Sequence, residues 1–240
     1  MKNLFNFKFA YIALFALFII FSSCTARLNA RLIQDGSGNI QIQAGLEPNM
    51  IALLRSFRGL SSGGQSNPAL DAASINRSLQ ASPGVSSSSL RNTGQEKIEG
   101  IVGISRFGDL LNAGANRFIS YQASSGAVSG RLAINLNRNI APRVLEQISP
   151  DLVDYLSALM APAATGEILS KGEYLSLVES VYGKALAGEI SASRITAVIA
   201  LPGPVKSVKG GTYLGPEARF DVPVIDLLVL ERPLDYEITW

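Results

Sequence analysis

The chemistry open to this 240-residue chain is limited by a single cysteine and by the complete absence of histidine. Without histidine the chain has no Ser-His-Asp triad, no Cys-His pair and no histidine-ligated metal site. One cysteine, Cys24, forms no intrachain disulfide and builds neither a four-cysteine zinc site nor an iron–sulfur cluster. We therefore expect no metal and no cofactor, and the thiol of Cys24 is the main reactive group to explain.

Other residue patterns come close to catalytic motifs without completing one. Residues 103–108 (GISRFG) miss the G-x-S-x-G nucleophile elbow by one residue. Residues 36–38 (GSG) lack the third glycine and the helix of a dinucleotide-binding loop. Asp151 and Asp154 lie at an apparent helix start, where a favourable interaction with the helix dipole accounts for them. We predict that the protein is not an enzyme and has no catalytic residues.

The charge of the chain points to no particular partner. The formal net charge is +2, which gives no bulk electrostatic reason to bind nucleic acid. Lys206 and Lys209 form a small basic spot that is typical of a solvated turn. A hydrolase that uses serine with lysine, or paired acids, stays an alternative without a local motif in its favour.

The first 24 residues have the pattern of an export signal. Residues 1–8 carry Lys2 and Lys8 and no acid, and residues 9–21 are thirteen uncharged residues, FAYIALFALFIIF. As a helix this stretch would be about 20 Å long, whereas a bilayer core is about 30 Å thick. We therefore predict a signal peptide over residues 1–23 rather than a transmembrane helix.

The end of this signal, Phe21-Ser22-Ser23-Cys24, resembles the lipobox of bacterial lipoproteins. The resemblance implies that the signal is cut before Cys24 and that the thiol carries a diacylglycerol, with a further acyl chain such as palmitate on the new amine. Phe21 departs from the usual aliphatic residue. Thr25 is not the aspartate that retains such proteins at an inner membrane, so the outer membrane is preferred if the cell has one. Ordinary signal cleavage and release as a soluble protein is the alternative.

Removing residues 1–23 leaves a body of 217 residues with 19 cations and 19 carboxylates. We predict that residues 24–240 form one domain, since this length buries about 70% of the unfolded surface. A neutral body has little attraction for anionic headgroups, so we expect the acyl anchor to hold the protein at the membrane.

Both ends of this body are predicted to form strands. Residues 25–34 and 40–44 alternate around a turn at 35–39, which predicts a hairpin with one buried face. Strands are also predicted at 97–105, in a hairpin of 117–122 with 129–136, and at 194–201, 205–208, within 218–230 and at 235–240. Trp240 is expected in the core.

The remaining segments predict helices and one irregular excursion. Ser149-Pro150-Asp151 opens one central helix, and Ser170 with Glu173 has capping-box spacing for a second that runs to residue 186. A short helix is predicted at 50–57, and a helical turn at 106–111. Residues 59–94 are rich in serine and glycine, so we expect a flexible excursion with a small helix from 67 to 79.

The tail, residues 201–240, and the turn Asp35-Gly36-Ser37-Gly38 resemble the LppM-type family of bacterial envelope lipoproteins. The resemblance covers both ends of the body and weakens between them. It implies an α+β envelope domain implicated in binding lipid or glycolipid, and no binding residue of that family maps to this chain.

These observations predict an α+β fold, with a largely antiparallel sheet from N- and C-terminal strands and two central helices packed on one face. We expect an acylated, non-catalytic lipoprotein of the bacterial cell envelope that binds a lipid or glycolipid. The alternative is a structural or assembly lipoprotein that binds another envelope protein through the excursion or the apolar residues 222–230.

Overall fold

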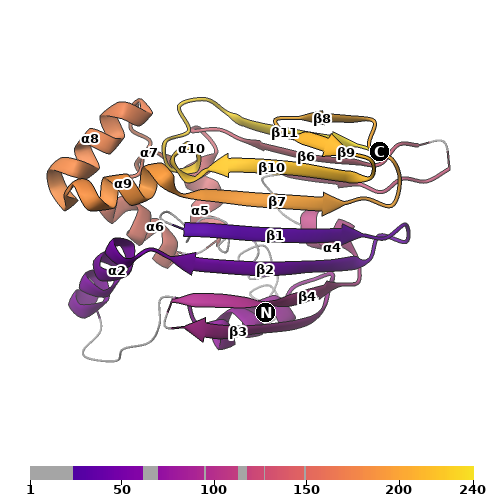
Figure 1. Ribbon diagram of the computed structural model, residues 1–240, viewed down its shortest axis with the longest axis horizontal. Helices are drawn as coiled ribbons and strands as arrows, with labels where there is room; N and C mark the ends of the chain where they lie inside the picture. Colours follow the sequence, from indigo (N-terminus) through magenta and orange to yellow (C-terminus); the bar gives the residue numbers. More distant parts are fainter. Residues whose placement is uncertain (1–23, 62–69, 95, 113–117, 127, 149) are drawn as a thin grey trace, which may run out of the picture.

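The computed structural model describes residues 24–61, 70–94, 96–112, 118–126, 128–148 and 150–240, and their strands form two sheets (Figure 1). The larger sheet has the strand order β3 (Val85–Gly94), β4 (Lys97–Ile104), β2 (Gly38–Leu46), β1 (Cys24–Leu32), β7 (Arg194–Ala200), β10 (Glu217–Pro223) and β9 (Thr212–Leu214). The smaller sheet has the order β5 (Ile119–Gln122), β6 (Arg131–Leu136), β11 (Leu234–Thr239) and β8 (Ser207–Lys209).

The α+β class and the largely antiparallel pairing are confirmed, and strands from both ends of the body share the larger sheet. Every paired strand runs antiparallel except β1 and β7, which are parallel. The C-terminal strands divide between two sheets, where the sequence predicted one. Phe220 of β10 and Tyr236 of β11 pack edge-to-face with ring centroids 5.5 Å apart, so the two sheets face each other through their apolar sides.

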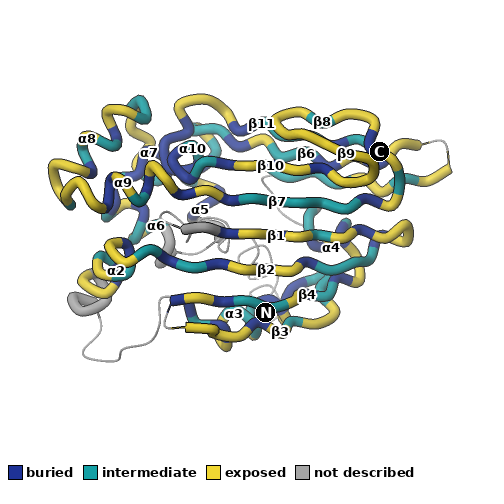
Figure 2. The backbone as a smooth tube through the Cα atoms, in the orientation of Figure 1, coloured by how far each residue is buried: buried dark blue, intermediate teal, exposed yellow. Residues whose placement is uncertain are grey.

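The predicted first hairpin forms as β1 and β2, with alternate residues buried (Figure 2). Ala26 and Leu28 lie in the core, while the alternating residues Arg27 and Asn29 are exposed. The connecting turn is held by Asp35, whose carboxylate accepts hydrogen bonds from the Ser37 N–H at 2.9 Å and from the Ser37 hydroxyl at 2.6 Å. Local sequence is enough to specify this element, because alternation and turn chemistry agree.

Helices gather behind the larger sheet and beyond the end at which β1 begins (Figure 1). They are α2 (Pro48–Ser61), α3 (Ala72–Gln80), α4 (Phe107–Asn112), α5 (Ala141–Ile148), α6 (Pro150–Ala158), α7 (Pro162–Thr165), α8 (Lys171–Tyr182), α9 (Lys184–Ala192) and α10 (Val224–Val229). The capping box of Ser170 and Glu173 is confirmed at the start of α8. The helix predicted to run to residue 186 ends instead at Gly183, whose φ of 92° is unfavourable for other residues, and α9 follows. The predicted N-cap Ser149 lies outside the described residues.

The prediction of a flexible excursion over residues 59–94 is wrong for its second half. Residues 85–94 form the edge strand β3, where no strand was predicted. The small helix predicted from 67 to 79 is found as α3, which Asp71 caps by accepting from the N–H groups of Ala73 and Ser74, at 3.1 and 3.3 Å. The run of serines at 86–89 has weak strand propensity, but pairing with β4 and packing against α3 override it. Residues 62–69 lie outside the described part of the chain.

The expectation that residues 222–230 supply an exposed binding surface is also wrong. This segment ends β10 and continues as α10, in which Val224, Leu228 and Val229 are among the most buried side chains. All residues of α10 except Asp226 are apolar and buried, and such a helix is stable only inside the core. The predicted core position of Trp240 is confirmed, since 4% of its surface is exposed.

Candidate functional site

Cys24, the predicted lipidation residue, is the first residue of β1, the central strand of the larger sheet. It pairs with Leu46 of β2, and the next residue, Thr25, pairs with Gly45 on one side and Arg194 on the other. Cys24 is therefore itself part of the sheet, with no linker between the two (Figure 1).

The helices around this end of the sheet are fixed by carboxylates. Glu189 of α9 accepts hydrogen bonds from the backbone N–H groups of Asn49 and Met50, at 3.0 and 3.1 Å, and from the Asn49 side chain at 2.6 Å. These N–H groups belong to the first turn of α2, which has no acidic residue of its own there. A side chain from a distant helix therefore caps α2.

A second carboxylate at this end, that of Glu96, is 4% exposed. It lies 3.6 Å from the guanidinium of Arg55 and accepts from the Leu70 N–H at 3.3 Å, while the Glu96 carbonyl accepts from the Leu46 N–H at 3.1 Å. A buried carboxylate is tolerated only with such partners. Glu96 thus joins α2, the chain before α3 and the end of β2.

A set of apolar side chains between the two sheets is only half-buried. Its members share an inward direction and intermediate exposure, and we call them the inter-sheet band: Ala30, Ile119, Tyr121, Ile134, Ala197 and Ile199. Ala197 pairs with Phe220, and Ile134 pairs with Tyr236. Because Phe220 and Tyr236 are in contact, the two halves of the band lie on facing walls.

Tyr121 marks the edge of the inter-sheet band. Its ring lies 6.3 Å from Phe107 and 6.2 Å from Trp240, measured between centroids. Burial raises the pKa of Tyr121, and burial, reinforced by Asp226 and Asp221, raises the pKa of Tyr236. Both shifts reflect the burial of these phenol groups, which disfavours the charged form.

The serine and lysine residues considered as possible catalytic groups form contacts within the fold. The Ser105 hydroxyl donates to the Gly84 carbonyl at 3.1 Å, and Lys209 forms an ion pair with Asp235. Lys206 donates to the Ser129 hydroxyl at 2.6 Å and to the Trp240 carbonyl at 3.3 Å. The Lys206–Ser129 contact was not evident from the sequence, since 77 positions separate the two residues. Both residues are exposed.

Two features of the described residues bear on metals and membranes. They contain no group of three or more cysteine, aspartate or glutamate side chains placed to hold a metal ion. None of their helices is long and apolar enough to cross a membrane. Asp154 is exposed, and the side chain of Asp151 lies outside the described part of the chain.

Comparison with known proteins leaves the family of the chain open. No family model matches the sequence, and no curated protein matches it. Among solved structures, the chain is similar to the NMR structure of the folded domain of the Mycobacterium tuberculosis LppM protein, with 11% identity and a TM-score of 0.38. The match covers 90% of this chain and 88% of that one. A likeness this distant assigns no function, and the acylation of Cys24 stays a prediction.

Proposed function

We propose that the protein is a lipoprotein of the bacterial cell envelope, held at a membrane by acyl chains on Cys24, and that its body binds a lipid or glycolipid between the two sheets. The observation that supports membrane anchoring is the position of Cys24. The single cysteine directly follows a signal-like segment and directly opens the central strand. Two or more acyl chains hold a protein stably at a bilayer, whereas one does so only marginally.

The inter-sheet band supports the lipid-binding part of this proposal. Its aliphatic and aromatic side chains point inward but stay partly exposed, and a bound acyl chain requires apolar side chains that it can reach. We further propose that this role is non-catalytic. The serine, lysine and aspartate side chains considered above are either engaged in structural contacts or exposed.

Metabolic labelling with palmitate tests the tether. The unaltered protein should incorporate label and sediment with membranes, and a Cys24→Ser variant should do neither. A Thr25→Ser variant, which keeps the thiol, is the matched control and should behave as the unaltered protein. A body released into the medium with an unmodified thiol at Cys24 would overturn the proposal.

Native mass spectrometry of the detergent-purified protein with envelope lipids tests the binding role. We expect a captured lipid that is lost in Ile134→Trp, because the indole would occupy the inter-sheet band. Asn135→Trp places the same side chain on the exposed outer side of β6 and should keep the lipid. If the unaltered protein captures no lipid while crosslinking in cells traps one abundant protein, an assembly role replaces lipid binding.

A further inference from the structure

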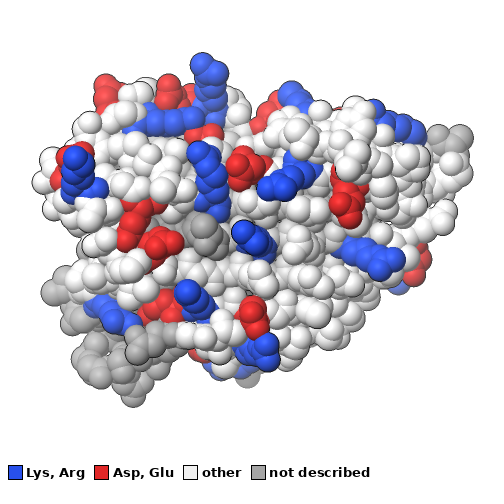
Figure 3. All heavy atoms as spheres, in the orientation of Figure 1, with Lys and Arg blue, Asp and Glu red and all other residues white. Residues whose placement is uncertain are grey.

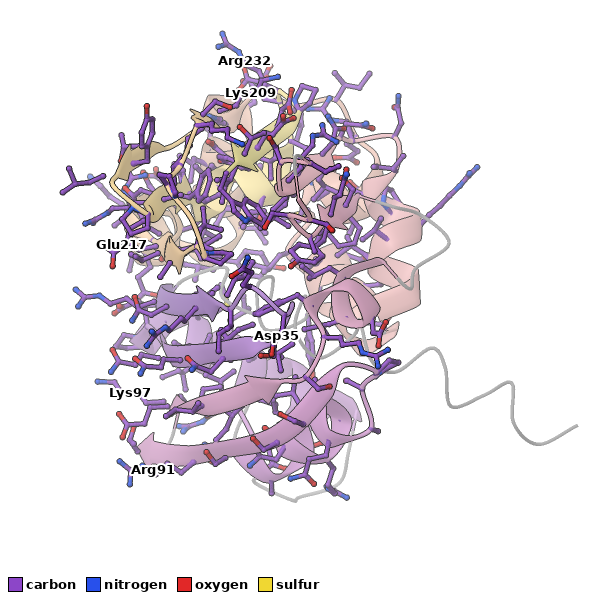
Figure 4. All side chains as sticks on the ribbon, turned by 90° about the vertical axis from the view of Figure 1, so that its right-hand side faces the viewer. Asp35, Arg91, Lys97, Lys209, Glu217 and Arg232 are labelled. Carbon is purple, nitrogen blue, oxygen red and sulfur yellow. The ribbon has the colours of Figure 1, made fainter. Side chains whose placement is uncertain are left out.

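The face of the larger sheet that points away from the smaller sheet is not covered by any described helix (Figures 1 and 4). Figure 4 views the sheet from one end, and Arg91, Lys97 and Glu217 all project from this side. We call it the open face. Its side chains come from alternate positions of β3, β4, β2, β1, β7, β10 and β9, which the strand order brings together.

The open face carries an excess of positive charge. Six cations lie on it, namely Arg27, Arg31, Arg91, Lys97, Arg194 and Arg219, against three carboxylates, Glu99, Glu217 and Asp221. Figure 3 shows this side of the molecule, with cations and carboxylates interspersed over it. Residues 24–240 as a whole are neutral, so the remainder of the body is correspondingly acidic. The body is therefore neutral in total, as its composition gives, but its charge is unevenly distributed over its surface.

Two of these cations lie beside the proposed anchor. The register across four strands reads Lys97, Gly45, Thr25 and Arg194, one residue from Cys24. The next row along the sheet contains Arg27 and Arg91 together with the carboxylates Glu99 and Asp221. The excess of positive charge is therefore largest in the row of Lys97 and Arg194, at the end where β1 begins.

Several of the cations are available to an external partner. Glu99 is paired with Arg91, whose Nε lies 3.1 Å from the carboxylate, and Asp221 accepts from the Thr196 hydroxyl at 3.2 Å. Within the described residues, no ion pair engages Arg27, Arg194 or Arg219.

We propose that the open face lies on an anionic membrane surface, where its arginines and lysine bind lipid phosphates. Charge complementarity carries the proposal, because each cation near such a surface strengthens association about fivefold. The strand positions of the open face include no phenylalanine, tyrosine or tryptophan. A protein-binding surface is usually centred on aromatic anchors, so this composition favours headgroups. This proposal adds a second membrane contact to the proposed acyl anchor, and it does not depend on acylation of Cys24.

The test uses the full protein purified from membranes and reconstituted in vesicles of phosphatidylcholine, with or without phosphatidylglycerol. A fluorophore is attached at Asn29→Cys on the open face, at Asn135→Cys on the outer side of the smaller sheet, or at Glu179→Cys on α8. All three positions are exposed. We expect the Asn29 position alone to be protected from a neutral aqueous quencher, in the anionic vesicles only. Raising the salt to ~0.5 M should remove this protection, since the Debye length falls to a few Å.

The matched variants remove three positive charges each. Arg27→Gln with Arg194→Gln and Arg219→Gln should abolish the protection, because they make the open face neutral. Arg143→Gln with Lys184→Gln and Arg232→Gln lowers the net charge equally at exposed positions elsewhere and should leave it intact. Equal quenching in both kinds of vesicle, protection at Glu179 instead, or equal loss in both triple variants would overturn the proposal. Vesicle flotation of the unaltered protein reports the anchor separately, and an unacylated protein should still float with anionic vesicles at low salt.

Discussion

The side chain of Asn76 forms two hydrogen bonds with the backbone of Leu90: its amide nitrogen donates to the Leu90 carbonyl at 2.7 Å, and its oxygen accepts from the Leu90 N–H at 2.9 Å. Leu90 lies on β3, the edge of the larger sheet. The amide of α3 therefore takes the place of a neighbouring strand at this position. Gln80 of α3 adds a similar contact, to the Ser88 carbonyl at 3.3 Å, and the Asn92 side chain of β3 donates to the Leu70 carbonyl at 2.6 Å. Exposed edges promote association with other chains, and this one is capped.

Replacing Asn76 with alanine should destabilise the protein and promote self-association. The variant leaves both backbone groups of Leu90 without their partner, at a cost of about 1–3 kcal/mol in the free energy of unfolding. Urea unfolding and light scattering measure the two effects. Ser74→Ala, at an exposed position of the same helix, is the control and should change neither. A stable, monodisperse Asn76→Ala protein would show that this cap is dispensable.

Gly130 should tolerate no side chain. It exchanges two backbone hydrogen bonds with Trp240, at 3.0 and 3.1 Å, and a Cβ added to it would lie 2.2 Å from the Trp240 ring. We expect Gly130→Ala to lower the free energy of unfolding by about 1–3 kcal/mol, as overpacking does, and to change the fluorescence of the single tryptophan.

Gly172 supplies the opposite prediction as a control. It lies within α8, and an added Cβ would have no neighbour within 4 Å. Gly172→Ala should therefore stabilise the protein by up to about 1 kcal/mol through helix propensity. Equal effects of the two substitutions would contradict this account of Gly130.

Glu189 should matter for stability through α2. Glu189→Ala leaves the N–H groups of Asn49 and Met50 without their acceptor, and loss of a helix cap costs about 1–2 kcal/mol. Hydrogen exchange should show that the first turn of α2 becomes less protected, while α8 is unaffected. The exposed Glu179→Ala is the control. An α2 that keeps its full protection in Glu189→Ala would rule out the cap.

Acid should weaken the start of α8. Hydrogen bonds from the backbone and side chain of Ser170 hold the pKa of Glu173 below its ordinary value of 4.5. A lowered pKa means that this contribution is complete above pH 4.5 and disappears as the pH falls through the folded-state value. The difference in Tm between the unaltered protein and Glu173→Gln should therefore be largest above pH 4.5 and shrink in acid. A difference independent of pH would exclude the ionised form as its source.

Elements that depend on neighbouring residues were predictable from the sequence. The turn at Asp35 and the capping box of Ser170 with Glu173 each depend on contacts within three residues. The strand β3 and the buried helix α10 were not predictable in this way. Serines 86–89 adopt a strand conformation because they pair with β4 and pack against α3. Residues 224–229 form a helix because their apolar side chains are buried in the surrounding core.

The candidate sites show the same division. Cys24 is proposed as a lipidation site from its sequence context alone, and this stays a prediction. The open face could not be predicted in this way, because Arg27, Arg91, Arg194 and Arg219 are far apart in the chain and meet only through the strand order. The inter-sheet band could not be predicted for the same reason, since Ala197 and Ile134 lie on facing sheets that meet through the contact of Phe220 with Tyr236.

The parallel pairing of β1 with β7 also determines the order in which the strands of the larger sheet can pair during synthesis. β2 follows β1 after a short turn, but β7 begins at Arg194, so the opposite side of β1 waits for most of the polypeptide to be made. Contacts of such long sequence separation slow folding and leave an unpaired strand that is prone to aggregate. A nascent chain that stalls before Arg194 would therefore leave the β7 side of β1 unpaired. Chaperones would be needed earliest at this edge of β1.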